Sequence, residues 1–130
     1  MAFPTDIEFI KAAESALGVL LPPEWRLRLL ASNGGDLVAA EDDWTVFPVF
    51  DSSDRKKASR SANHIVRENQ SAHEWRGFPP AAVAIAENGS GDYLVFLPSQ
   101  SSPGVLDEKL FLWSHETETL SLVANTLEGL

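Results

Sequence analysis

Apolar positions near the start of the chain recur at intervals of three and four residues, the spacing that places side chains on one face of a helix. They are Ile7, Ile10, Ala13 and Leu17. Thr5 and Glu8 have the spacing of a capping box, in which the two side chains bond exposed amides at a helix start. Gly18 favours the left-handed conformation that ends a helix. The pattern predicts a first helix that begins near Thr5 and ends at Gly18.

A second helix is predicted directly afterwards. Pro22 and Pro23 suit its first positions, where a backbone N–H would have no acceptor within the helix. Trp25 and Leu29 lie one turn apart and form its buried stripe. The sequence Asn-Gly-Gly at residues 33–35 ends it.

Residues 44–50 are rich in aromatic and β-branched side chains, which favours a strand, although Pro48 restricts this strand to a sheet edge or a bulge. Residues 51–54 then offer caps for a third helix, which ends before Gly77. Its apolar positions are Ala58, Ala62, Ile65, Val66 and Ala72.

The second half of the chain predicts two hairpins. Residues 83–85 and 93–96 read as strands joined by a polar, glycine-containing loop, and residues 110–113 and 120–122 repeat this arrangement. Residues 124–130 are predicted to form a short closing helix. With helices at the front and hairpins at the back, the expected fold class is α+β. We expect a single compact domain over residues 1–130, with a largely antiparallel sheet and helices packed against it.

Composition narrows the class of protein. The chain has 130 residues, 44% of them apolar, but no apolar run long enough to cross a bilayer, so no membrane partner is expected. Its first residues resemble no secretion leader, and it has no cysteine, which excludes disulfides and thiolate metal sites. A cytoplasmic location is the expectation.

The net charge of −9 argues against direct binding to nucleic acid, which requires clustered Lys and Arg, and favours a cationic partner. The acids gather between residues 36 and 54, a segment without Lys or Arg. They are Asp36, Glu41, Asp42, Asp43, Asp51 and Asp54. This segment is either a solvated face that keeps the protein soluble or a patch that binds a partner.

Reactive residues offer little chemistry. Ser114, His115 and Glu116 are adjacent, but neighbours on a strand point to opposite faces, so a nucleophile–base pair is not expected. His64 and His73 would lie on opposite faces of one helix and cannot share a metal there. The Gly-x-Gly at residues 89–91 precedes a strand rather than a helix, so it is interpreted as a turn. No cofactor or metal is expected.

The four tryptophans divide into two pairs. Trp25 and Trp113 occupy patterned helix and strand positions, which indicates the core. Trp44 and Trp75 lie beside charged residues, where either a core position or an interface position is consistent with the sequence.

Six segments, in this order, resemble the SUKH superfamily, which includes a fungal cell-wall-assembly regulator and many bacterial immunity proteins. They are the first helix, the Leu-Pro-Pro-Glu-Trp start at residues 21–25, the stop at residues 33–35, Phe-Pro-Val at residues 47–49, residues 85–93 and residues 112–116. The resemblance covers nearly the whole chain. It implies a compact α+β domain without catalytic residues that binds other proteins.

The resemblance implies an immunity protein that neutralises a toxin, often a nuclease, and the acidic charge suits such a basic partner. The expected partner-binding residues are Asp36, Glu41, Asp42, Asp43 and Trp44, with Asp107, Glu108 and Glu118 as a second group. The chain is expected to be a monomer or a weak homodimer. A regulatory scaffold that binds a cellular protein is the alternative, and a hydrolase using His115, Glu116 and Asp92 is a third.

Overall fold

The computed structural model describes residues 2–127 as four helices and six strands. The helices are α1 (Ile7–Leu17), α2 (Pro23–Ala31), α3 (Arg55–Arg60) and α4 (Ile65–Ala72). The strands are β1 (Asp36–Ala39), β2 (Asp42–Val46), β3 (Val83–Glu87), β4 (Tyr93–Phe96), β5 (Leu110–Ser114) and β6 (Thr119–Ala124). The strands form one antiparallel sheet in sequence order, which confirms the α+β class.

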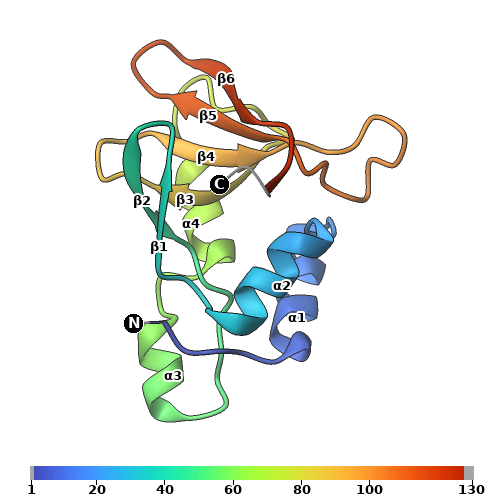
Figure 1. Ribbon diagram of the computed structural model, residues 1–130, viewed down its shortest axis with the longest axis vertical. Coiled ribbons are helices and arrows are strands. Elements are labelled where there is room, and N and C mark those ends of the chain that lie inside the picture. The colour runs from blue at the N-terminus through green and yellow to red at the C-terminus, as the bar shows by residue number, and fades with distance from the viewer. Residues whose placement is uncertain (1, 128–130) are drawn as a thin grey trace.

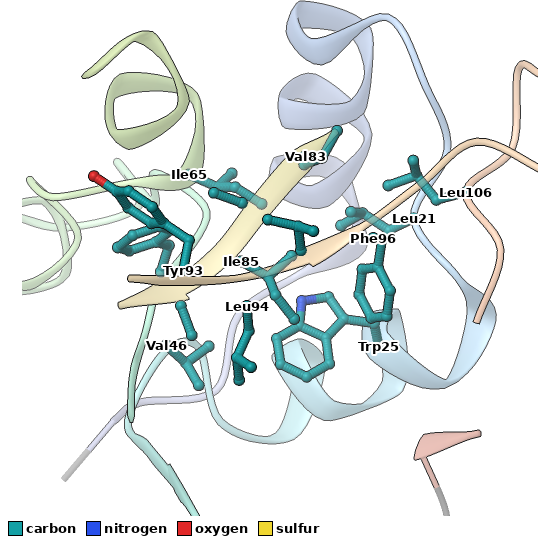
Figure 2. Close-up of a cluster of buried hydrophobic side chains, with 14 of the residues drawn as sticks. Leu21, Trp25, Val46, Ile65, Val83, Ile85, Tyr93, Leu94, Phe96 and Leu106 are labelled. Atoms are coloured by element: carbon teal, nitrogen blue, oxygen red, sulfur yellow. The ribbon is translucent and has the colours of Figure 1, made fainter. Parts of the chain in front are cut away.

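The helices pack against the sheet and against one another (Figure 1). α4 packs against β3, and α1 lies between α4 and α2. Trp25 of α2 meets Phe96 of β4 edge to face, with 5.6 Å between the ring centroids, as the side chains in Figure 2 show. Trp25 and Trp113 are both buried, so their predicted core positions are confirmed.

The predicted capping box is wrong, because a buried carboxylate takes the Thr5 hydroxyl. Thr5 Oγ1 donates to Asp51 Oδ2 at 2.7 Å, and α1 begins after Asp6, which makes no side-chain cap. Ile7, expected on the buried face, is 40% exposed. The helix end is as predicted, since Gly18 has φ of 80°.

The predicted third helix is two helices. Asp54 caps the first by accepting from the Lys57 N–H at 2.8 Å. The buried Ser61 hydroxyl donates to Lys57 O and accepts from the Asp51 N–H, which ties the end of α3 to a distant segment. His64 then starts α4, because its Nδ1 accepts from the Arg67 N–H at 3.3 Å.

The strand predicted at residues 44–50 ends earlier, at Val46, and is preceded by β1, which the sequence analysis missed. Past the end of β2, the Asn69 side chain takes the place of a strand: Nδ2 donates to Ala84 O and Oδ1 accepts from Ala84 N, both at 2.8 Å. β6 extends through Ala124, so the expected closing helix does not begin there, and residues 128–130 of that prediction lie outside the described residues.

Candidate partner-binding surface

Three hairpin turns lie at one end of the sheet. In an antiparallel sheet in sequence order, the β1–β2, β3–β4 and β5–β6 turns must lie at the same end of the strands. Figure 1 shows them together, away from the long β4–β5 connection. We call this surface the turn edge. Its residues are Glu41, Asp42, Asp43, Asn88, Asp92, His115, Glu116 and Glu118.

The β1–β2 turn presents the first acidic group. Ala40 and Glu41 have φ of 51° and 59°, the paired positive values of a two-residue type I′ hairpin turn. Glu41, Asp42 and Asp43 are all exposed. The backbone N–H of Asp43 donates to Asp42 Oδ1 at 2.8 Å, which orients the Asp42 carboxylate.

Side chains connect the three turns. Asn88 Nδ2 donates to Asp42 Oδ2 at 3.1 Å and to Asp92 Oδ2 at 3.4 Å. Asp92 Oδ1 accepts from the His115 backbone N–H at 3.1 Å and lies 2.7 Å from His115 Nδ1. These bonds form a chain from β2 to the β5–β6 turn, and they orient the carboxylates of Asp42 and Asp92.

The same contacts keep Asp92 ionised. Burial by itself raises the pKa of its carboxyl, but the hydrogen bonds from His115 and Asn88 outweigh burial and hold the pKa below the ordinary value. Because an ionised carboxylate only accepts hydrogen bonds, the proton in the short contact to His115 is on Nδ1.

Glu87, the last residue of β3, adds negative charge beside the turn edge. Partial burial raises the pKa of its carboxyl, and the nearby charge of Glu68 on α4 raises it further. The negative charges of Glu87 and Glu68 therefore repel one another beside the turn edge.

Trp75 provides an exposed aromatic surface next to the turn edge. Its ring is 42% exposed, lies 5.4 Å from the His115 ring, and donates from Nε1 to the Tyr93 hydroxyl at 3.2 Å. Glu118 covers Gly77, where an added Cβ would come within 2.5 Å of its carboxylate. Of the two positions that the sequence left open for Trp75, the core is excluded by this exposure, and the side chain is available at the surface.

Trp44 is a correction. Its ring is 1% exposed and its Nε1 donates to Ala39 O at 2.8 Å, so its side chain supports the β1–β2 hairpin from inside the core. The expectation that this side chain contacts a partner is wrong, because Trp44 and Val46 occupy the inner face of β2 while Asp43 and Thr45 face outward.

The structure separates the other expected residues. Asp36 starts β1 at the opposite end of the sheet, where its carbonyl accepts from Arg28 Nη2 at 3.1 Å. Asp107 and Glu108 lie in the β4–β5 connection, and Asp107 Oδ1 accepts from the Lys109 N–H at 3.1 Å. Of the second expected group, only Glu118 belongs to the turn edge.

Sequence reasoning missed the link between Asn88, Asp92 and His115. It interpreted residues 89–91 as a turn, and within that turn Asn88 Oδ1 does accept from the Ser90 N–H at 2.9 Å. The bond from Asp92 to His115 spans 23 positions along the chain, so only strand register reveals it. The polar residues at the predicted turn ends were the available signal.

The His115–Asp92 pair resembles half of a hydrolase triad, and Ser114 is the hydroxyl nearest to it in the sequence. Between residues 2 and 127, no hydrogen bond joins the Ser114 hydroxyl to His115, and no group of three His, Asp or Glu residues is placed to hold a metal ion. His64 and His73 cap opposite ends of α4. No helix in the described range is long and apolar enough to cross a membrane.

The architecture and the turn edge define a class: an α+β domain whose single antiparallel meander sheet presents an acidic edge. The chain belongs to the SMI1 / KNR4 family (SUKH-1), whose sequence profile matches residues 4–130. This match confirms the resemblance to the SUKH superfamily and is consistent with an immunity-like or regulatory role. No curated protein matches the chain.

Proposed function

We propose that this protein is an immunity protein that binds a basic toxin domain in the cytoplasm and neutralises it through the turn edge. The observation that carries this proposal is the gathering of exposed carboxylates from the β1–β2 and β5–β6 hairpins at one end of the sheet, joined by the chain of hydrogen bonds from Asp42 through Asn88 and Asp92 to His115. Because these bonds already orient Asp42 and Asp92, those two side chains lose little freedom when the surface binds.

Charge explains why a nuclease toxin suits this surface. A nuclease must attract a polyanion, so its active-site cleft is cationic, and a protein with net charge −9 is steered towards that cleft. An acidic edge seated in the cleft competes directly with the nucleic acid. Trp75 supplies the kind of exposed aromatic anchor that dominates many interfaces.

The test pairs cell rescue with binding kinetics. The toxin domain encoded beside this protein is produced in cells with and without it, and association is measured at several salt concentrations. The double variant Glu41→Lys, Asp43→Lys reverses two exposed charges and leaves the Asp42–Asn88 bond in place. We expect about a tenfold slower association, a weaker salt dependence and reduced rescue.

Asp107→Lys, Glu108→Lys is the matched control, because it makes the same charge change at the opposite end of the sheet. The proposal expects a much smaller effect there, confined to the general loss of negative charge. A larger effect in this control than in the first variant would move the interface to the β4–β5 connection.

Stoichiometry separates binding from catalysis. An immunity protein protects only when it is at least equimolar with the toxin, whereas a hydrolase using His115 would protect at a small fraction of that amount. Capture of a cellular regulator, with affinity indifferent to salt and no rescue, would favour the regulatory scaffold.

A further inference from the structure

β6 is an uncovered sheet edge. It is the last strand in the sheet order, and within residues 2–127 only β5 pairs with it. Its sequence, Thr-Leu-Ser-Leu-Val-Ala, contains no charged residue and no proline, the features with which soluble proteins usually block an edge strand. A register shift opposite residues 110–111 limits the regular stretch to residues 119–122.

The opposite edge is protected. β1 has only four residues, and Arg28 donates from Nη2 to Asp36 O at 3.1 Å and from Nη1 to Gly34 O at 3.0 Å. The guanidinium occupies Asp36 O at the start of β1 and Gly34 O just before it, so these two carbonyls are not available to another strand. The two edges therefore differ in their capacity to pair.

Two leucines on β6 strengthen the contrast. Leu120 is 36% exposed and Leu122 is 52% exposed. They are two positions apart, so their side chains point to the same face of the sheet. An apolar pair beside unpaired backbone groups is suited to contact with another strand of the same character.

Register defines which backbone groups are available. Ser114 and Thr119 close the β5–β6 turn, where the Glu118 N–H donates to Ser114 O at 2.7 Å. Ser114 and Thr119 therefore form a hydrogen-bonded pair, and along an antiparallel ladder such pairs alternate with non-hydrogen-bonded pairs. Leu120 and Leu122 are in non-hydrogen-bonded pairs with β5, so their backbone N–H and C=O groups point away from β5.

We propose that two copies of this chain associate through antiparallel pairing of β6 with β6, centred on Ser121. In this register Leu120 of one copy is opposite Leu122 of the other, both pairs exchange backbone hydrogen bonds, and the four leucine side chains meet on one face. The contact is isologous, so it closes into a dimer and does not propagate.

The strand pattern makes a second copy the fitting occupant, because an antiparallel copy brings its own uncharged strand and its own exposed leucines opposite those of the first. Antiparallel pairing places Glu118 beside the uncharged Ala124 end of the other copy, so the acidic turns are at opposite ends of the contact. Because each copy carries a net charge of −9, added salt screens the repulsion and strengthens the dimer. The contact is small, and the dimer is therefore weak and reversible.

The first test is sedimentation equilibrium between micromolar and millimolar protein. Wild type should approach twice the monomer mass as concentration and salt rise, and Leu122→Lys should remain a monomer. Val38→Lys is the matched control, since Val38 is an exposed apolar residue, 69% exposed, on the other edge strand; this variant should dimerise like wild type. A monomer under all conditions, or a dimer equally present in Leu122→Lys, would overturn the proposal.

The second test uses the absence of cysteine from the chain. In the proposed register, Ser121→Cys places the two cysteines opposite each other, with about 4.5 Å between their Cα atoms. A disulfide can span this Cα–Cα distance. Mild oxidation should give a covalent dimer many times faster than Ser90→Cys, an exposed control on the β3–β4 turn. Equal rates for the two variants would exclude the β6 contact, whatever the fate of the proposed toxin interface.

Discussion

At the residue scale, two asparagines replace missing strand backbone. Asn33 exchanges hydrogen bonds with Val49 N and O, both at 2.9 Å, and Asn69 does the same with Ala84. A side-chain amide carries one donor group and one acceptor, as a peptide unit does. Asn69 bonds the backbone of β3 beyond the end of β2, and Asn33 bonds the segment that follows β2. The chain can therefore leave the sheet after β2 while these backbone groups stay hydrogen-bonded.

Replacing Asn69 by Leu should lower the free energy of unfolding by about 2–4 kcal/mol, because the buried N–H and C=O of Ala84 lose their partners. Urea denaturation measures the change. Gln70→Leu is the control, since Gln70 is the exposed neighbour on the same helix. A loss below about 0.5 kcal/mol in Asn69→Leu would show that Ala84 finds other partners.

Asp51 gives the fold a pH dependence. Burial alone raises the pKa of its carboxyl, but hydrogen bonds from Ser53 and Thr5 and the charge of Lys57 hold the pKa below the ordinary value. The unfolded chain therefore takes up this proton first as pH falls. The stabilisation is complete above the unfolded pKa of about 4 and disappears as pH drops through the folded value.

Asp51→Asn should consequently be less stable than wild type at pH 7, by about 1–3 kcal/mol, and the difference should shrink below pH 4. Thermal unfolding across this pH range measures it. Glu41→Gln, which makes the same carboxylate-to-amide change at an exposed turn position, serves as the control. A difference that stays constant with pH would mean that shape, and not charge, makes Asp51 important.

At the element scale, local signals predicted the parts of the fold that local chemistry determines. Gly18 ends α1, and the apolar runs become β3, β4, β5 and β6 at nearly the expected positions. The break between α3 and α4 depends on Ser61 bonding Asp51, a contact between distant segments that helix periodicity does not contain. The α1 start was missed for the same reason, since Thr5 bonds Asp51 instead of its own helix.

The β1–β2 hairpin was missed because its turn lacks the usual turn residues. Positions with positive φ favour Asn and Gly, whereas this turn uses Ala40 and Glu41. The acids of the candidate site were recognised, but their grouping with Asn88, Asp92 and His115 follows from which turns share an edge. Strand order, and not composition, determines that grouping.

The unusual turn leads to a stabilising substitution. Ala40→Asn should raise the free energy of unfolding by about 0.5–1 kcal/mol, because Asn adopts the left-handed conformation at lower cost than Ala. Thermal melting measures the gain. Ala62→Asn, at an exposed residue that is not among those with positive φ, should give no gain. An equal gain at both sites would attribute the effect to something other than turn geometry.

At the scale of the whole molecule, the two proposed contacts use different parts of the sheet. The turn edge lies at the strand ends, and the β6 contact runs along the last strand. A toxin seated on the turn edge leaves Leu120 and Leu122 available, so both contacts are compatible in one assembly.

Light scattering on the concentrated toxin complex should therefore give a mass of two copies of each protein, and Leu122→Lys should reduce it to one of each while rescue is retained. Val38→Lys again provides the control. A wild-type complex limited to one copy of each protein at every concentration would show that toxin binding and dimerisation exclude one another.

The sequential strand order has an evolutionary consequence. Each turn of the turn edge joins two strands that are already neighbours, so its length and side chains can change without altering how any other strand is paired. Substitutions in three short turns can therefore change what a protein of this fold recognises, while the pairing of its six strands is kept.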